Sequence, residues 1–297
     1  MSKKEDKIRQ PGGTGKTGTL LMMVSDKGGA GKTTDSIILS ECLTKLDIKV
    51  AKIDMDGVIS GLSGRLGKRN ADGSYNNDPF ESVAVYNVRS EEQQEALISV
   101  AKIDAEIVLC DTPAHVRDNI LNVVDQKSGQ VNEYVESIKM FAPDKQICFS
   151  HVIDRNKASV FSVQNYLDLF SPYSDIVKHV VVLNMQSHSN KIEQRFGYWF
   201  GFDMPVLDEN GRSTGEKKRV GGKIRDRFLK EGGLEIVIGN IPETAGDKID
   251  QQNCRFLDAC GAMPKYDILN LAENRMVYSV MENAENETKR LVEFLAS

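Results

Sequence analysis

A glycine-rich segment, KGGAGKTT at residues 27–34, carries residue types that can hold a phosphate group. It follows the apolar run 20–24 and precedes the apolar residues 37–39, so the order is strand, loop, helix, as a phosphate-binding loop requires. Glycines let the backbone turn tightly and direct several N–H groups at one point, where a helix N-terminus adds positive partial charge. Lys32 could then reach the terminal phosphates of a nucleotide, and the Thr33 hydroxyl could bind Mg²⁺.

Carboxylates follow two other apolar runs. Asp54 and Asp56 come after residues 50–53, and Asp111 follows residues 107–110. A single aspartate at the end of an apolar strand can hold the Mg²⁺ of a bound nucleotide, usually through water, because Mg²⁺ keeps much of its hydration shell. The sequence therefore predicts one site that combines the glycine-rich loop with these strand-end aspartates.

Apolar runs alternate with helical patterns from residue 19 onward. Most runs are continuous and rich in Val and Ile, as strands covered on both faces should be. The expected strands are 19–25, 49–54, 82–86, 105–110, 146–150, 177–184 and 234–239, and the expected helices are 33–46, 90–102, 117–126, 130–141, 157–170, 246–260 and 272–296. This alternation predicts an α/β fold with a doubly wound, mainly parallel sheet flanked by helices. Ligands of such sheets lie beyond the carboxyl ends of the strands, where the loop and the aspartates can converge.

Polar segments set the expected domain organisation. Residues 1–18 are polar and glycine-rich and are expected to form a flexible tail, with a single domain over 19–297. Residues 62–80 are expected to form a loop, and residues 187–233 an insertion with a hairpin-like turn at 208–211. The insertion contains an aromatic cluster that is expected to form a local core or a partner surface, consisting of Phe196, Tyr198, Trp199, Phe200 and Phe202.

The glycine-rich loop departs from the strict GxxxxGK[ST] pattern. Asp26 stands where the first glycine should be, and a second lysine, Lys27, opens the loop. In this it resembles the deviant Walker A motif of the ParA/MinD family of ATPases. The resemblance covers about residues 20–260, with specific motifs at 26–34, 54–56 and 111–113, the last matching the D-x-P of the family's switch II. It is closest to the small ParA type, which has no helix-turn-helix before the ATPase.

The resemblance implies an Mg·ATP site and a role for each of its residues. Lys27, Lys32 and Asp56 would be catalytic, with Asp56 orienting or activating the attacking water. The metal would be held by Thr33, Asp54 and Asp111. Residues in contact with the nucleotide would be Gly28, Gly29, Ala30, Gly31, Lys32, Thr33 and Thr34 around the phosphates, and Asn184 and Pro242 beside the adenine. One departure is Gly57, which stands where ParA proteins commonly carry proline.

Lys27 is the residue that implies a partner. In the family, the loop-opening lysine of one subunit reaches the nucleotide of the other, so the resemblance implies a homodimer that forms on ATP binding and separates after hydrolysis. The alternative is a monomeric ATPase whose Lys27 stays within its own chain.

A basic segment suggests what the ATPase is coupled to. Residues 212–230 contain eight cations against two acids, and such a surface would meet DNA phosphates without reading bases. The candidate DNA contacts are Lys217, Lys218, Arg219, Lys223, Arg225 and Arg227. A solvated charged face is the alternative interpretation.

Composition restricts the cellular setting. The net charge of −5 excludes a uniformly basic nucleic-acid binder. The five cysteines form no CxxC pair, no apolar run approaches a membrane span, and MSKKEDKIRQ contains no apolar signal segment. We expect a cytoplasmic protein, associated with the nucleoid if it binds DNA. The acid-rich C-terminal segment argues against membrane binding through a basic amphipathic helix.

The function that these features predict is a ParA-like ATPase for plasmid or chromosome partition. Its ATP-bound dimer would bind DNA non-specifically, and an adaptor protein of the ParB kind would stimulate hydrolysis. One alternative is an accessory ATPase for conjugative DNA transfer or for positioning a protein machine. Another is a MinD-like regulator recruited to the membrane.

Overall fold

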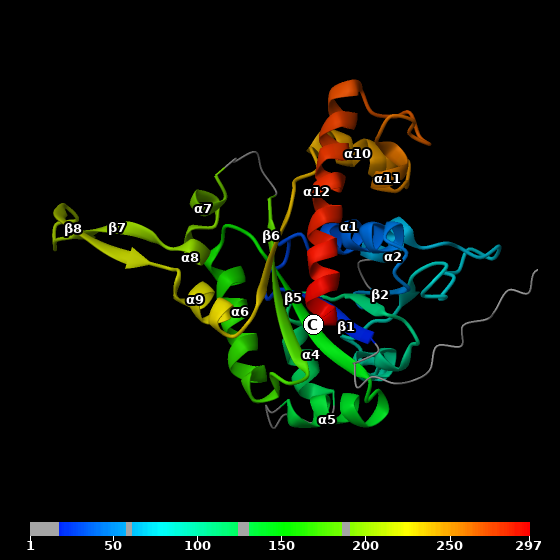
Figure 1. Ribbon diagram of the computed structural model, residues 1–297, viewed down its shortest axis with the longest axis horizontal. Helices are drawn as coiled ribbons and strands as arrows, with labels where there is room; N and C mark the ends of the chain where they lie inside the picture. The colour runs from blue at the N-terminus through cyan, green and yellow to red at the C-terminus, as the bar shows by residue number, and fades with distance from the viewer. Residues whose placement is uncertain (1–17, 58–60, 124–130, 186–190) are drawn as a thin grey trace, which may run out of the picture.

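A seven-stranded sheet forms the centre of the molecule (Figure 1). The computed structural model describes residues 18–57, 61–123, 131–185 and 191–297. The strand order is β3-β2-β4-β1-β5-β6-β9, and every neighbouring pair is parallel. The strands are β1 Gly18–Val24, β2 Val50–Asp54, β3 Ala84–Val85, β4 Ile107–Asp111, β5 Lys145–Ile153, β6 Val177–Asn184 and β9 Leu234–Ile238. The predicted α/β architecture is confirmed, and all seven expected strands are present.

Helices cover both faces of the sheet because the strands are apolar on both sides. Along β1, Leu21 and Met23 belong to one core cluster while Leu20 and Met22 belong to another, as the two-residue period of a strand dictates. The first face is covered by α1 Lys32–Lys45, α10 Glu243–Gln251, α11 Phe256–Ala259 and α12 Leu271–Ala296. The opposite face is covered by α3 Ala96–Ser99, α4 Val116–Asn122, α5 Asn132–Phe141 and α6 Lys157–Phe170. Within the described ranges, none of the helices is long and apolar enough to cross a bilayer.

Three expected elements differ in detail. The helix expected over 90–102 is split into η1 Glu91–Gln93, α3 and η2 Val100–Lys102. The helix expected over 246–260 ends at Gln251, and Asn253 then adopts a left-handed φ of 47°, which stops helical propagation. The loop expected over 62–80 begins inside a helix, α2 Gly61–Leu66. Its backbone is held by tertiary contacts, since the N–H of Ser63 donates to Asp54.

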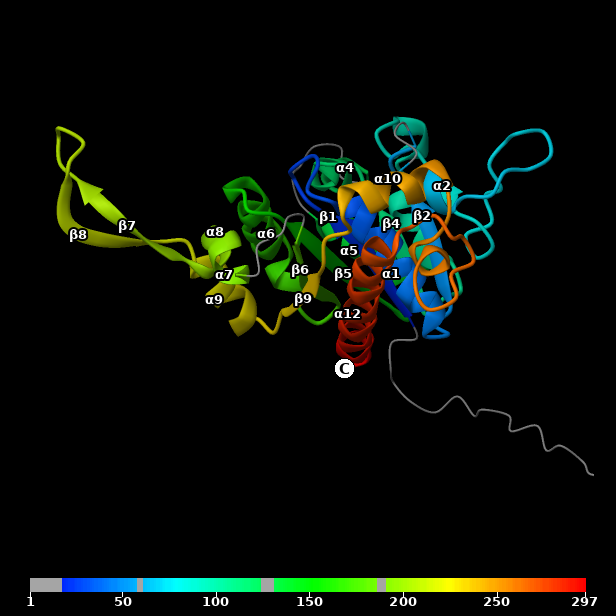
Figure 2. The ribbon, with the colours of Figure 1, turned by 90° about the horizontal axis from the view of Figure 1, so that it is seen from above.

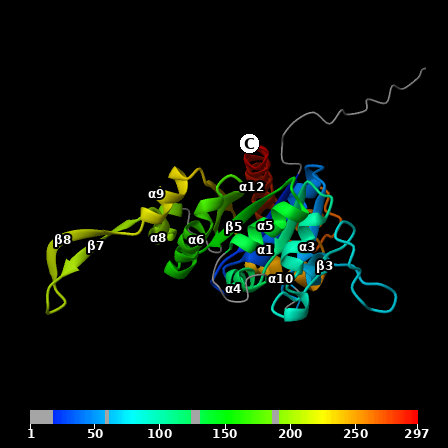
Figure 3. The same ribbon diagram turned by 90° about the horizontal axis from the view of Figure 1, so that it is seen from below.

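The expected insertion is an arm that leaves the body beside β6 and β9. The arm contains α7 Ile192–Arg195, α8 Gly197–Phe200, β7 Phe202–Leu207, β8 Ser213–Val220 and α9 Lys223–Lys230. Outside the arm, a short 3-10 turn, η3 Ser171–Tyr173, follows α6. β7 and β8 form an antiparallel hairpin that projects away from the sheet in all three views (Figure 1, Figure 2, Figure 3). Phe196 and Trp199 are buried with Phe228 of α9 against residues of β5, α6 and β6, so these two aromatics pack on the body and do not form a separate local core. Of the expected tail, residues 1–17 lie outside the described residues, and Gly18 is the first residue of β1.

Candidate nucleotide-binding site

The glycine-rich loop joins the end of β1 to the start of α1, as the sequence predicts. Gly29 and Gly31 have φ angles of 72° and 98°, which only glycine adopts without strain. Gly31 is the N-cap of α1, so Lys32 and Thr33 stand in the first turn of that helix. Exposed backbone N–H groups at such a helix start favour a bound anion. Gly61 of α2 packs closely against Thr33 of the loop, since a Cβ at Gly61 would lie 2.7 Å from the Thr33 methyl.

Asp111 is held directly against the loop. The Thr33 hydroxyl donates to its Oδ2 over 2.8 Å, and the Ser36 hydroxyl donates to its Oδ1 over 2.9 Å. The side chain is buried, and burial raises the pKa of Asp111 to about 6, with Asp54 adding to the rise and Thr33 opposing it. Lys32 is buried nearby, and burial lowers its pKa although Asp111 and Asp56 attract the proton.

Asp54 lies next to Asp111 across the sheet, since the two are register partners on β2 and β4. Its carboxylate accepts the N–H of Ser63 over 2.9 Å and the N–H of Asp56 over 3.1 Å. Thr33, Asp54 and Asp111 therefore converge, as predicted. A hydroxyl and two carboxylates suit Mg²⁺, which takes few protein ligands and fills the other positions with water and phosphate oxygens.

Asp35 is a buried acid at this site that the motifs do not include. Neither of its carboxylate oxygens has a hydrogen-bond partner, and burial together with the charge of Asp111 raises its pKa well above the ordinary range. An unpaired buried carboxylate is costly unless it is protonated or faces a cation. The raised pKa favours the protonated, neutral form of Asp35, which avoids the cost of a buried unpaired charge.

Asp56 lines a cavity of about 540 Å³ together with the loop and Asp111. Its Oδ1 is buried without a partner, and its Oδ2 lies 3.3 Å from the Arg89 guanidinium. Arg89 lines the same cavity. It reaches Asp56 because the segment around Asn87 pairs with Asp56 in an isolated bridge. No motif in the sequence identified this arginine.

Arg89→Ala is expected to lower ATP turnover about tenfold while changing Mg·ADP affinity less than about threefold, because the arginine holds the carboxylate of Asp56 and not the nucleotide. Steady-state turnover and calorimetric titration measure the two effects. Arg89→Lys, which keeps the charge, should recover part of the rate, and the exposed Arg69→Ala serves as control. Equal losses in turnover and affinity, or no loss, would contradict this role.

Lys27 is paired within its own chain in this structure. Its ammonium group contacts the carboxylate of Asp154, which directly follows β5. Burial alone would raise the pKa of Asp154, but hydrogen bonds from Lys27, Asn156 and Ser159 hold it below the ordinary value. The neighbouring Asp26 is also held, by Arg117 at 3.3 Å. No sequence motif points to Asp154, which is 127 residues from Lys27.

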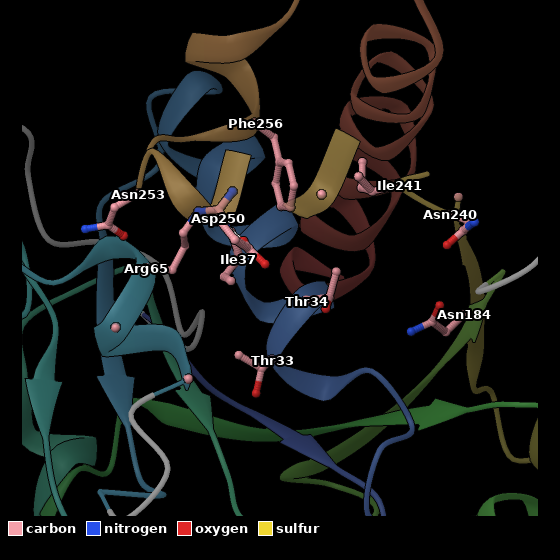
Figure 4. A pocket seen from close by; sticks show the side chains of 14 residues that line it. Thr33, Thr34, Ile37, Arg65, Asn184, Asn240, Ile241, Asp250, Asn253 and Phe256 are labelled. Carbon is pink, nitrogen blue, oxygen red and sulfur yellow. Dashed lines mark ion pairs between the residues drawn. The ribbon is translucent and has the colours of Figure 1, made fainter. Parts of the chain in front are cut away.

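A second cavity of about 410 Å³ adjoins the first, since Thr33, Thr34 and Gly61 line both (Figure 4). Asn184 lies on its wall, and the Asn184 amide donates to the carbonyl of Ala30 over 3.1 Å. Pro242 does not line this cavity, whereas Ile241 does. Residues on its walls that the motifs missed are Ile37, Arg65, Asn240, Asp250, Asn253 and Phe256.

Arg65, Asp250 and Phe256 form one wall of the second cavity, and Asn184 and Asn240 lie on the other side (Figure 4). Arg65 of α2 forms an ion pair with Asp250 of α10, and its guanidinium lies 4.8 Å from the centre of the Phe256 ring. This wall joins segments that are nearly 200 residues apart. A cavity with one polar edge and an aromatic side chain suits a nucleoside, and its continuity with the loop cavity suits a phosphorylated one.

Glu41 of α1 anchors this wall, because its carboxylate accepts the N–H groups of Phe256 and Leu257 over 3.0 and 2.9 Å. Burial raises the pKa of Glu41 from 4.5 to about 7, so the folded protein holds this proton more tightly than the unfolded chain. Its contribution to the free energy of unfolding therefore falls as the pH rises through that window.

Glu41→Gln, which cannot ionise, is expected to reduce the pH dependence of stability by on the order of 3 kcal/mol at most. Urea unfolding of both proteins at about pH 5 and about pH 7.5 measures the change. An unaltered pH dependence in the variant would show that Glu41 does not titrate in this window.

The six candidate DNA contacts do not form one free patch. Arg225 binds Glu235 with two hydrogen bonds, and Arg227 pairs with Asp168 and Glu231. Arg219 lies 3.6 Å from Asp203 and donates to the carbonyl of Phe200. Lys217 and Lys218 are on β8 and Lys223 begins α9, all three exposed.

Residues 18–140 match the AAA_31 family model, described as an AAA domain. No curated protein matches the chain. Solved structures of similar arrangement include the MinD cell division protein of Aquifex aeolicus, with 15% identity, a TM-score of 0.48 and coverage of 93% of this chain and 97% of that one.

Two further solved structures are similar. One is a plasmid partition protein of Borrelia burgdorferi bound to AMPPNP, with 14% identity, a TM-score of 0.47 and coverage of 94% and 99%. The other is the septum site-determining protein MinD of Pyrococcus horikoshii with Mg-ADP, with 15% identity, a TM-score of 0.46 and coverage of 94% and 99%. The region matched by the family model contains the deviant loop and all three strand-end aspartates, which are the motifs of ParA/MinD-type P-loop ATPases.

Proposed function

We propose that this protein hydrolyses Mg·ATP and uses the reaction to switch between two states of association. The observation that carries the proposal is the convergence of Thr33, Asp56 and Asp111 on the loop cavity, with Asp54 beside Asp111 on the neighbouring strand. Lys32 and the loop N–H groups would bind the phosphates, and the unpartnered Oδ1 of Asp56 would orient the attacking water. Bound Mg²⁺ would neutralise charge on the phosphate oxygens.

The proposed switch is a dimer that forms with ATP and separates after hydrolysis. Lys27 is its key residue, on the family pattern of a lysine that reaches the partner's nucleotide. In the structure Lys27 contacts Asp154, so this ion pair would have to open before Lys27 could serve a second subunit. We propose that dimerisation exchanges this internal contact for the partner's phosphate.

The proposed output is non-specific DNA binding in plasmid or chromosome partition, with hydrolysis stimulated by an adaptor protein. Support comes from the exposed lysines of the arm, Lys217, Lys218 and Lys223. A dimer carries two arms, and binding through both at once raises the apparent affinity without any new contact. DNA binding would in this way depend on ATP.

Filter binding with random-sequence duplex DNA tests the proposed output. We expect retention with Mg·ATP and little with Mg·ADP or without nucleotide. Substitution of Lys217, Lys218 and Arg219 by Ala should weaken retention and lower the slope of log affinity against log salt by about 2 to 3, one phosphate contact per cation.

The matched control replaces three exposed lysines outside the arm, Lys102, Lys265 and Lys289, by Ala. Retention that ignores nucleotide, or equal losses in both triple variants, would contradict the DNA assignment. ATP-dependent sedimentation with anionic liposomes in place of DNA retention would favour a membrane-recruited regulator instead.

A further inference from the structure

A third cavity, of about 470 Å³, lies where the arm joins the body. It is formed by α6, α8, the end of β8 and the start of α9, which gather at the base of the hairpin (Figure 1, Figure 3). The two glycines between β8 and α9, Gly221 and Gly222, form part of its surface. Gly221 must be glycine, because a Cβ would lie 2.5 Å from the carbonyl oxygen of Tyr198.

Positive charge surrounds this cavity from three elements. Lys157 comes from α6, Lys218 and Arg219 from β8, and Lys223 from α9, and the lining includes no carboxylate. Among the described residues, Lys157, Lys218 and Lys223 make no ion pair, whereas Arg219 lies 3.6 Å from Asp203. The loop cavity, by contrast, contains Asp56 and Asp111. The cavity at the arm therefore favours an anion of several charges.

The same cavity has an aromatic and aliphatic wall. Phe161 of α6 is 44% exposed although it is a large apolar side chain. Tyr198 lies on the opposite element, and Val160, Val220 and Ile224 also line the space. Lysines beside an exposed aromatic side chain suit a ligand that has both phosphates and flat apolar rings.

We propose that this cavity binds a segment of single-stranded nucleic acid, with its phosphates at Lys157, Lys218 and Lys223 and a base against Phe161. The inference rests on the proposed DNA-linked function and specifies the form of nucleic acid. A duplex keeps its bases stacked inside and would leave the apolar wall unused.

Helix α6 links this cavity to the nucleotide loop. Lys157, Phe161 and Gln164 face the cavity. Another side of the same helix holds the loop, because the N–H of Asp26 donates to Ser162 over 3.0 Å and Ser159 donates to Asp154, the partner of Lys27. Single-stranded nucleic acid bound in the cavity would therefore contact the helix that positions the first residues of the loop. We expect the affinity of the protein for this ligand to differ between Mg·ATP and Mg·ADP.

Fluorescence anisotropy with fluorescein-labelled dT10 tests the inference on the full chain. Lys218→Ala with Lys223→Ala should weaken binding at least tenfold and lower the salt slope by about 1.4, two contacts on a single strand. Phe161→Ala should weaken binding about tenfold through lost stacking. The controls are Lys230→Ala, at the far end of α9, and Phe141→Ala, an exposed phenylalanine on another helix.

Phe161→Trp provides a fluorescence signal that reports directly on stacking at this position. Stacking of dT10 on this tryptophan should quench its fluorescence, while Trp199, which is fully buried, should not respond. Competition by an unlabelled 20-bp duplex and by a poly-glutamate peptide completes the test. Quenching by dT10 that neither competitor relieves at equal charge supports the inference.

Two outcomes would overturn it. If the wild-type protein binds the duplex as tightly as dT10, and Phe161→Ala does not change dT10 affinity, the cavity is not a single-strand site. The proposed function would still stand in that case. If poly-glutamate competes as well as dT10, the site accepts an acidic peptide. Conversely, dT10 binding to the cavity without any ATP-dependent retention of DNA would support this site and remove the partition function.

Discussion

Lys32→Ala is expected to abolish nucleotide binding, lowering the affinity for Mg·ADP by at least about 100-fold, which corresponds to roughly 3 kcal/mol. Lys32 stands in the first turn of α1 and lines the loop cavity with Asp56 and Asp111. Its charge-assisted hydrogen bonds to phosphate oxygens cannot be replaced by alanine. Calorimetric titration with Mg·ADP measures the loss without hydrolysis.

The control for this variant is Lys45→Ala, at the other end of the same helix, where the lysine pairs with Glu285. That variant should keep wild-type affinity. If circular dichroism shows that the Lys32→Ala protein is folded and it still binds Mg·ADP with wild-type affinity, the loop cavity is not the phosphate site.

Asp56→Ala is expected to lower ATP turnover by about 100-fold or more while leaving Mg·ADP affinity within about threefold. The carboxylate lines the cavity, and its Oδ1 is buried without a partner, so it is placed to hold a water molecule. It is not a ligand of the phosphates, because Lys32 and the loop N–H groups occupy that role. A single-turnover assay separates the chemical step from product release.

Asp104→Ala is the matched control for the aspartate, since Asp104 is a fully exposed acid that pairs with Lys49. Turnover there should be unchanged. If Asp56→Ala turns over at the wild-type rate, the attacking water is oriented by another group and the proposed mechanism is wrong at that step.

The sequence predicts those parts of the site that depend only on which residues follow each strand in the chain. The loop, Asp54 and Asp111 each follow a strand directly, and parallel strands deliver their ends to one edge. The seven strands were predictable for a similar reason, because burial on both faces demands continuous apolar runs. Helix ends were less predictable, as at Asn253, where a left-handed residue stops α10.

Long-range pairs were not predictable from one sequence. Asp154 and Lys27 meet across 127 residues, and Arg89 reaches Asp56 only through the bridge at Asn87. The same limit applies to the basic segment, because one sequence does not show which of its cations are paired with acids elsewhere. Arg225 is held by Glu235 of β9, an acid that lies outside the segment.

Lys27 is the residue that would distinguish an ATP site shared by two subunits from the site of a monomeric ATPase. In this structure its ammonium group is held by Asp154, whose carboxylate is buried. Separating the pair leaves Asp154 with the hydrogen bonds from Asn156 and Ser159. These bonds keep the buried carboxylate partly satisfied when Lys27 moves to a partner.

The most direct test is sedimentation velocity of the Asp56→Ala protein, in which ATP is expected to persist. We predict a dimer with Mg·ATP, a monomer with Mg·ADP, and a monomer in both when Lys27→Ala is added while nucleotide binding is retained. A monomer with saturating Mg·ATP, or a dimer that forms equally well without Lys27, would contradict the proposal that two copies of this chain share the nucleotide.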